Sequence, residues 1–301
     1  MGCYEDPKEG NYEFFDKVLE YIKKANEAES DHTPDNDYSC CDSFSKIWKS
    51  EVKKEENVKT ICKQFIKLYK SLSDIKCKSI DGSKYTKDCA FLNYWVNMII
   101  REYRTNNNNC ANNFSNQMES HCYNIFFQLN ILSDLLYDIK EDDFNKIDIL
   151  YNLYVNYDNL KSTINDYSDS NKLSVSYSDN CYYTYKIAES MHNDQDNTFN
   201  EKLTKFTSEY QEIYSTFAEK EKKFNIYFKR LSDKQNNIIT TSVLGSLVGF
   251  IPFMGILYKF TPMGQIFRSK NKKFTKEYSN NYDNSISLHQ ERYNVKYDSV
   301  A

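Results

Sequence analysis

Glycine and proline are scarce in this sequence, with 7 and 4 residues among 301. Between residues 35 and 244 there is no proline and a single glycine, Gly82. A β-rich domain needs turn residues roughly every eight to twelve positions, so their scarcity favours long helices over a sandwich or barrel in this stretch. The sequence therefore predicts an all-α fold built from long helices.

Recognisable catalytic and cofactor motifs are also lacking. The chain has no GxGxxG, no P-loop, no GxSxG and no HExxH. The best polar cluster is His192, Asp194 and Asp196, which we interpret as a surface loop. His121 and Cys122 are helix neighbours that point in different directions, which disfavours a thiol and base pair. We expect no enzyme and no cofactor; an enzyme on a novel helical fold, using the cluster at 192–196, is the alternative.

A basic domain is missing as well. The net charge is −4, and residues 261–301 carry seven Lys or Arg against four Asp or Glu, or +3, which leaves −7 for the first 260 residues. No basic face precedes residue 260, so the charge pattern excludes a nucleic-acid-binding protein.

Against this background stands one long uncharged stretch. Residues Ile238 to Tyr258 contain no charge in 21 positions, whereas 27% of the whole chain is charged. A helix of this length rises roughly 30 Å, the thickness of the hydrocarbon core of a bilayer. We predict a transmembrane helix at 238–260, with a kink at Pro252. The alternative is a buried core helix, which normally keeps a larger polar face than this stretch has.

Small residues within the predicted span suggest self-association. Gly245 and Gly249 form a GxxxG motif, on which two such helices can approach closely. The motif predicts weak homo-association in the lipid bilayer; the alternative is that both glycines are merely tolerated in lipid.

The cysteines are distributed asymmetrically about this span. All nine precede it and none follows, which indicates an oxidised N-terminal domain and a reduced C-terminal tail. No Cys-x-x-Cys occurs, and this spacing disfavours a conventional zinc site. The pairing stays open, because eight cysteines allow 105 connectivities. The candidate disulfide cysteines are Cys40, Cys41, Cys62, Cys77, Cys89, Cys110, Cys122 and Cys181.

The span divides the chain into three parts. We predict a helical ectodomain at 1–237, with a poorly defined segment at 1–42, and a cytoplasmic tail at 261–301. Basic residues flank both sides of the span equally and do not fix its orientation. The tail places a basic run against an anionic inner leaflet, at about 1 kcal/mol per residue. This membrane-surface run comprises Arg268, Lys270, Lys272, Lys273 and Lys276.

Apolar periodicity places the helices of the ectodomain. Helix-period stripes are expected at 11–28, within 43–72, and at 85–104, 114–139 and 144–163, then from 181 past 191, and a stalk helix at 198–237 leads into the membrane. Polar loops are expected at 29–42, 105–113 and 166–180.

Several stretches resemble a known family. DCAFLNYWVNMII at 88–100 resembles the Cys-x-x-Leu-Asn-Tyr-Trp signature of the Plasmodium interspersed repeat proteins, the PIR or Vir-type variant antigens. VKTICKQFIKLYKSL at 58–72 fits the cysteine-bearing helix before it, and residues 181–214 are similar to the last ectodomain segment of that family. GFIPFMGILYKFTPMGQIFR at 249–268 resembles its span and Tyr-Lys-Phe-Thr-Pro-x-Gly exit. The first 40 residues and those beyond 270 match nothing in the family pattern.

The resemblance implies a helical, cysteine-bearing domain displayed by a blood parasite on the infected red cell or on the parasite itself. Antigenic variation, immune evasion and adhesion to host cell-surface or immune receptors are the roles it implies. The alternative is a cytosol-facing membrane scaffold with reduced cysteines, acylated at its Met-Gly-Cys start, although Asp6 departs from the myristoylation pattern. The sequon at Asn113 is a glycosylation candidate if the domain is lumenal.

Overall fold

The computed structural model describes residues 11–30, 38–48, 57–72, 87–103, 110–126, 136–165, 171–220 and 228–233. All of them belong to one compact unit of the chain. The predicted span with Gly245 and Gly249, the basic run at 268–276, and Cys77 lie outside these ranges. No helix within the described ranges is both long and apolar enough to cross a membrane.

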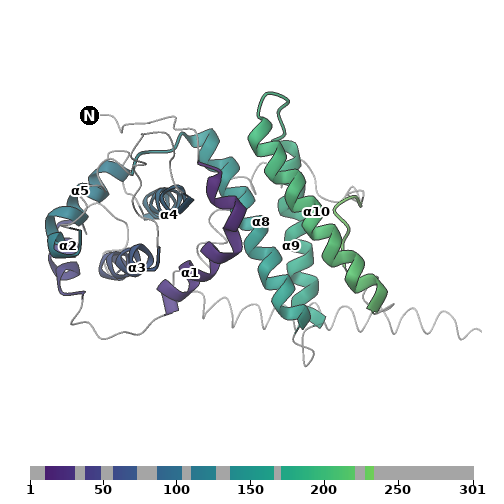
Figure 1. The fold of residues 1–301 in the computed structure, drawn as a ribbon, viewed down its shortest axis with the longest axis horizontal. Helices are drawn as coiled ribbons and strands as arrows, with labels where there is room; N and C mark the ends of the chain where they lie inside the picture. The colour runs from purple at the N-terminus through teal and green to yellow at the C-terminus, as the bar shows by residue number, and fades with distance from the viewer. Residues whose placement is uncertain are drawn as a thin grey trace, which may run out of the picture. The chain divides into compact units, whose positions relative to one another are not determined.

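Every regular element of the described residues is a helix, which confirms the predicted all-α class for this part of the chain (Figure 1). The elements in chain order are η1 (Glu13–Lys17), α1 (Val18–Ser30), α2 (Cys40–Trp48), α3 (Val58–Ser71), α4 (Lys87–Tyr103), α5 (Ala111–His121), α6 (Tyr123–Phe126), α8 (Glu141–Asn165), α9 (Asn171–Ser190) and α10 (Asn197–Lys220).

Helix α4 is the centre of the N-terminal group of helices. Of its 17 residues 14 are buried, so it is enclosed on all sides rather than on one stripe. Figure 1 shows α3 and α4 end on, between α2 and α5 on one side and α1 and α8 on the other. This enclosure explains why the stretch at 88–100 is so rich in aromatic and aliphatic residues: every face of the helix has a neighbour to fill.

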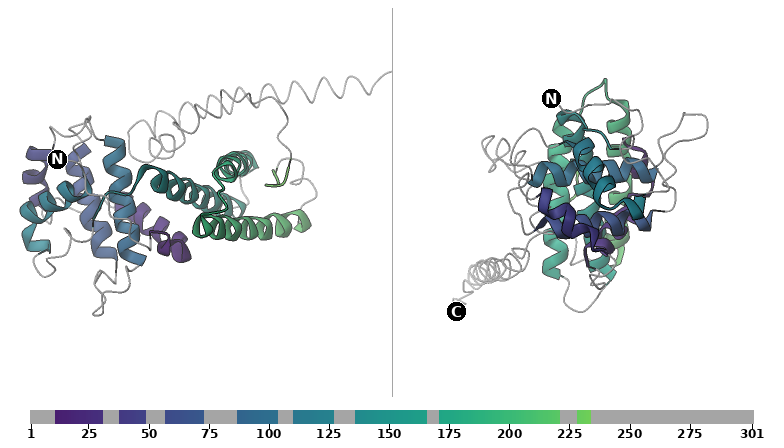
Figure 2. Two further views of the ribbon diagram at one scale, coloured as in Figure 1. Left: turned by 90° about the horizontal axis from the view of Figure 1, so that it is seen from above. Right: turned by 90° about the vertical axis from the view of Figure 1, so that its left-hand side faces the viewer.

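The helices α8, α9 and α10 form a second group. Helix α8 packs along α9 and also against α10, and Figure 2 shows the long helices side by side. The helix α8 also contacts α1 and α4, so it joins the two groups into one core. The aromatic ring of Phe206 on α10 meets Tyr154 of α8 edge-on, with centroids 5.3 Å apart.

The element η1 contacts both groups of helices. Phe14 and Phe15 are buried and their rings stack. The burial of Phe14, Val18, Tyr21 and Ile22 confirms the predicted apolar side of residues 11–28. Asp16 accepts hydrogen bonds from Lys87 of α4 at 2.7 Å and from Lys202 of α10 at 2.8 Å. One carboxylate thus links three segments that lie far apart in sequence.

Two buried asparagines on α4 hold an extended segment against it. The side-chain oxygen of Asn93 accepts the backbone N–H of Tyr137 at 3.0 Å, and that of Asn97 accepts the N–H of Ile139 at 3.0 Å. The amide of Asn97 also donates to the carbonyl of Tyr137 at 2.9 Å. Since Asn93 and Asn97 are four residues apart, they lie on the same helix face and contact alternate backbone groups of the extended chain.

This segment corrects the predicted helix at 114–139. The structure has α5, then a break at Cys122 with φ −111° and ψ 35°, then the short α6. Leu136 and Ile139 are buried as their apolar character required, but in extended chain. Hydrogen bonds from the α4 asparagines replace the helical ones for Tyr137 and Ile139, an override by tertiary contacts that periodicity does not reveal.

Two predicted loops are also shorter than expected. Cys40 and Cys41, placed in the loop at 29–42, instead open α2. Residues 171–180, placed in the Ser/Asp-rich loop at 166–180, begin α9, so Cys181 lies within a helix rather than at its start. The buried Ser178 shares a hydrogen bond with Tyr210 of α10 at 3.1 Å. Packing on neighbouring helices thus outweighs the low helix propensity of Ser and Asp.

Part of the stalk helix predicted at 198–237 is not helical. Helix α10 ends at Lys220, and residues 228–233 form a turn in which Phe228 and Leu231 are buried. The backbone of Lys229 accepts a hydrogen bond from Tyr210 at 2.9 Å and donates one to Ser178 at 2.9 Å. The near-heptad spacing therefore reflects packing onto α9 and α10 at residues 228–231, where the chain is not helical.

Replacing Asn97 by leucine tests the asparagine anchor. The change leaves the Tyr137 carbonyl and the Ile139 N–H without these partners inside the core, so we expect a loss of about 2–4 kcal/mol in the free energy of unfolding. Urea denaturation followed by circular dichroism measures it. Asn116→Leu on the exposed surface of α5 is the control, expected within about 0.5 kcal/mol of the wild type. Equal effects for both variants would contradict the anchor.

Candidate functional site: a four-cysteine cluster

Four cysteines from three helical elements converge at one place. Cys40 and Cys41 begin α2, Cys62 lies within α3, and Cys122 caps the end of α5. Their sulfur atoms all lie within 4.8 Å of one another. Cys40 is half-buried and the other three are buried. We call this group the four-cysteine cluster.

The cluster is oxidised in the structure, as two disulfides. Cys40 pairs with Cys122 across a sequence separation of 82 residues, and Cys41 pairs with Cys62 across 21. Adjacent cysteines at the start of one helix thereby link it to two different partners. This explains the otherwise unusual Cys-Cys pair: α2 is a nine-residue helix whose attachment depends on both bonds as well as on its apolar face.

Aromatic side chains surround the site. Phe44 and Trp48 of α2 pack on Phe114 of α5, with centroids 5.7 and 5.1 Å away. Phe65 of α3 meets the same ring edge-on at 5.1 Å. Because all these rings are buried, the three helices that carry the cysteines are held together by packing as well as by covalent bonds.

Of the other cysteines predicted to form disulfides, the described ones are either disulfide-bonded or free. Cys89 and Cys110 are also disulfide-bonded. Cys181 is free and buried on α9, so its prediction as a disulfide cysteine is wrong. Burial in an apolar environment raises the pKa of its thiol, which makes it an unreactive core residue. Sequence alone does not separate these cases, because a buried free thiol and a helix-to-helix disulfide occupy the same kind of apolar stripe.

The polar cluster at residues 192–196 lies in the connection between α9 and α10. His192 and Asp194 are 3.9 Å apart, with the Asp194 side chain fully exposed. Asp196 instead forms an ion pair with Lys146 of α8 and accepts the backbone N–H of Phe199 at 3.1 Å, which caps α10. These residues end one helix and start the next, a structural role that polar loops commonly have.

Helix α8 buries a carboxyl group that sequence analysis did not single out. Asp148 is buried, accepts a hydrogen bond from the Tyr94 hydroxyl at 2.7 Å and another from the Asn152 amide at 3.1 Å. Desolvation raises the pKa of Asp148 to about 6, although the hydrogen bonds and the charge of Arg101 lower it. Tyr94 belongs to the stretch at 88–100, so one residue of that stretch donates a hydrogen bond to this buried acid.

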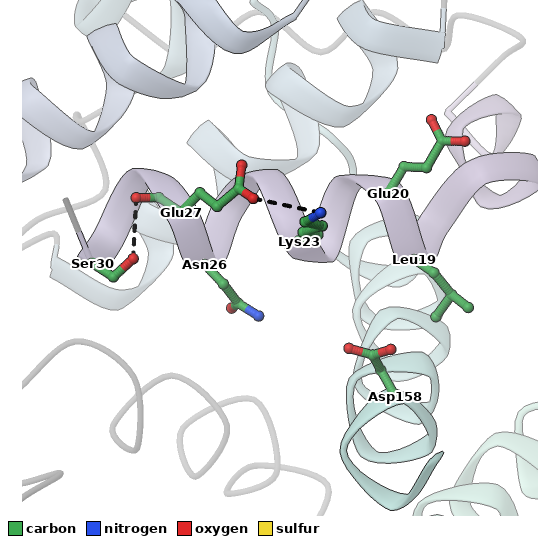
Figure 3. Close-up of a pocket in the computed structure, with 7 residues that line it drawn as sticks. All are labelled: Leu19, Glu20, Lys23, Asn26, Glu27, Ser30 and Asp158. Atoms are coloured by element: carbon green, nitrogen blue, oxygen red, sulfur yellow. Dashed lines mark hydrogen bonds and ion pairs between the residues drawn. The ribbon is translucent and has the colours of Figure 1, made fainter. Parts of the chain in front are cut away.

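A shallow groove of about 550 Å³ lies between α1 and α8 (Figure 3). Lys23 and Glu27 form an exposed ion pair at 3.8 Å, and the Ser30 hydroxyl donates to the backbone of Glu27. Figure 3 shows Asp158 of α8 facing the residues of α1 that line the groove. Its lining residues are Leu19, Glu20, Lys23, Asn26, Glu27, Ser30 and Asp158.

The sequon is largely inaccessible in the folded domain. Phe114 and Ser115 are fully buried on α5, and the Ser115 hydroxyl donates to the Asn112 carbonyl at 2.8 Å. A glycan at Asn113 therefore has to be attached before α5 packs, since the acceptor motif must be accessible to a transferase.

Comparison with known proteins gives no family assignment. No protein-family model matches the chain, and no match was found among curated proteins or solved structures. The interpretation of the site therefore rests on its own geometry.

Removing each disulfide separately tests its contribution to stability. The chain-entropy relation gives about 4–5 kcal/mol for the 82-residue separation of Cys40 and Cys122 and about 3 kcal/mol for the 21-residue separation of Cys41 and Cys62. We expect C40S/C122S to lower the free energy of unfolding more than C41S/C62S does. Chemical denaturation measures both. C181A is the control, because Cys181 is free. If C181A lowered the free energy of unfolding more than either double variant does, the assignment of the two disulfides would be contradicted.

The buried Asp148 predicts a pH dependence of stability. Its folded pKa of about 6 exceeds the unfolded value of 3.8, so the folded state retains the proton as pH rises from about 4 to 6 while the unfolded state loses it. Stability contributed by this group therefore falls over that window, by about 3 kcal/mol, and is constant above it. D148N is expected to lack this slope, whereas D194N at a fully exposed side chain retains it. Unfolding midpoints between pH 4 and 7 provide the test; parallel curves for the wild type and D148N would refute it.

Proposed function

We propose that this chain is a single-span membrane protein that displays its helical domain outside the cytosol as a variant surface antigen of a blood-stage malaria parasite. The observation that carries the proposal is the disulfide-bonded state of the helical domain, which includes six described cysteines. Disulfides persist in oxidising compartments and are rare in the cytosol. The uncharged stretch at 238–258 supplies the membrane anchor in this proposal.

Helix α10 has a buried apolar face and an exposed polar face, and this arrangement supports a display role. Its inward positions are large and apolar, for example Phe206 and Tyr210. Its outward positions are polar: Glu201, Thr204, Lys205, Ser208, Gln211, Glu212 and Ser215. Substitutions at such exposed positions usually change stability by less than about 0.5 kcal/mol. A domain of this kind can change its outer face, and hence its recognition by antibodies or host receptors, while the same core maintains the fold.

Resemblance in the stretches at 88–100 and 249–268 supports the particular class. In the described part, Asn93, Tyr94 and Asn97 make buried hydrogen bonds that position another segment or satisfy a buried acid. The first of these stretches thus has a structural role in holding the core, which is what an invariant framework beneath a variable surface requires. Antigenic variation, immune evasion and adhesion to host receptors are the proposed roles.

A cytosol-facing, membrane-anchored scaffold is the second candidate. The four-cysteine cluster favours it in one respect, because four converging sulfur atoms also suit a reduced protein that binds a metal ion. The two candidates place the same domain on opposite sides of the membrane, so topology decides between them.

A lysine map on intact cells tests the proposed topology. An amine-reactive reagent that does not cross membranes is applied to infected red cells and to isolated parasites, and labelled sites are identified by mass spectrometry. We expect labelling at Lys23, whose side chain is 77% exposed, and at Lys205 on α10. Lysines of the basic run, such as Lys272, are expected to react only after permeabilisation. The reverse pattern would exclude display and support the scaffold.

The thiol state of the same preparation is a second readout. Alkylation before and after reduction is expected to find Cys40, Cys41, Cys62 and Cys122 blocked, because the domain is proposed to have passed through an oxidising compartment. The buried thiol of Cys181 is expected to react only after denaturation. If all nine cysteines react without reduction, the domain faces the cytosol.

A further inference from the structure

We propose that the four-cysteine cluster, when its two disulfides are reduced, binds one Zn²⁺ through the sulfur atoms of Cys40, Cys41, Cys62 and Cys122. The four sulfur atoms already lie within 4.8 Å of one another. They are contributed from three places in the chain, which is why no zinc-finger spacing appears in the sequence.

The distances are close to those that zinc requires. A Zn–S bond of about 2.3 Å sets the sulfur atoms of a tetrahedral site about 3.8 Å apart. Sulfur atoms that are joined in a disulfide, at about 2.05 Å, have to separate by less than about 2 Å. Those that are not bonded have to approach by about 1 Å at most from the 4.8 Å limit. Side-chain rotation about the Cα–Cβ bonds provides movements of this size without moving the helices.

The helices that carry the ligands are also joined by packing, in addition to the disulfides. The aromatic contacts of Phe44 and Phe65 with Phe114 join α2, α3 and α5 by packing. The backbone N–H of Cys122 donates to the Met118 carbonyl at 2.9 Å, which fixes the end of α5. The ligand positions are therefore expected to stay close together after reduction. Four thiolates in a buried apolar setting select a soft or borderline cation over Mg²⁺ or Ca²⁺.

The negative charge of the proposed zinc site is partly offset by its surroundings. One Zn²⁺ with four thiolates carries a net charge of −2. Cys40 and Cys41 occupy the first turn of α2, where unpaired backbone N–H groups and the positive end of the helix dipole favour negative charge. Lys59 of α3 pairs with Asp42 of the same turn at 2.7 Å and so balances the carboxylate that lies beside the site. The N-terminus of α2 offsets part of the charge, and the half-buried Cys40 leaves the site open to solvent for ion entry.

The chemistry of loading balances in two steps. In the first, each disulfide takes two electrons from a dithiol reductant, which becomes a disulfide itself and transfers its two protons to the protein sulfurs. In the second, Zn²⁺ displaces the four thiol protons to solvent and forms four Zn–S bonds. Zinc binding and disulfide formation use the same four sulfur atoms, so the two states exclude each other. The proposal concerns the reduced chain, so it is separate from the proposed function, in which the cluster stays disulfide-bonded.

Metal titration of the full chain tests the proposal. The protein is purified in detergent and reduced without oxygen by a phosphine, which becomes a phosphine oxide by taking oxygen from water while the protein gains the protons. Co²⁺ is added as a spectroscopic probe and then displaced by Zn²⁺. We expect one equivalent of Co²⁺ to give thiolate charge-transfer absorption and the intense visible bands of tetrahedral coordination. The spectrum is expected to disappear with one equivalent of Zn²⁺.

Alkylation mapping locates the metal. Reduced protein is treated with a thiol reagent in the presence of either Zn²⁺ or a chelator, and each cysteine is quantified by mass spectrometry. We expect zinc-dependent protection at the four cysteines of the cluster. Cys181 is expected to show the same reactivity in both conditions, because its burial does not depend on zinc. Protection at other cysteines, or no protection at all, would overturn the proposal whether or not the reduced domain is folded.

The two ends of α5 provide a matched pair of variants. Cys122 follows the helix and belongs to the cluster, whereas Cys110 precedes it and does not. We expect C122S to lose stoichiometric Co²⁺ binding and C110S to retain it. Serine at position 110 is also a good residue to cap a helix, so that control has no reason to disrupt α5. Equal binding by the two variants would show that the metal is held elsewhere.

Discussion

The enclosure of α4 is the constraint on which the N-terminal half of the structure depends. A helix buried on every face cannot leave its polar groups to water, so each polar side chain on it needs a specific partner. Asn93 and Asn97 contact the extended chain at Tyr137 and Ile139, and Tyr94 contacts Asp148 of α8. These hydrogen bonds give the core directional specificity that apolar packing by itself lacks.

The four-cysteine cluster adds covalent order at the edge of this core. Helix α2 has only nine residues, and a helix of that length is marginal by itself. Its adjacent cysteines fasten it to α3 and α5, while its aromatic residues join their apolar contact. In the reduced chain, the same four sulfur atoms form the proposed zinc site. One arrangement of sulfur atoms therefore connects stability, redox compartment and metal affinity.

Much of the fold was predictable because apolar spacing records which face of a helix is buried. The stripes at 11–28, 85–104 and 144–163 correspond to η1 with α1, to α4 and to α8. The prediction of a helix over 114–139 was wrong because an extended segment also buries Leu136 and Ile139. The hydrogen-bond partners of that segment are two asparagines of α4, which is distant in sequence. The prediction of a loop at residues 171–180 was wrong because helix propensity is a weak effect compared with tertiary packing.

By itself, the sequence determined the helical class of the described residues, the amphipathic faces of most helices and the presence of many cysteines before an uncharged stretch. Local spacing suffices for these, since they depend on neighbours within a few turns. Only the tertiary structure decided that Cys40 joins Cys122, that Cys41 joins Cys62 and that Cys181 stays free. Pairing depends on distances between helices, and those are set by the packing of side chains that are remote in sequence.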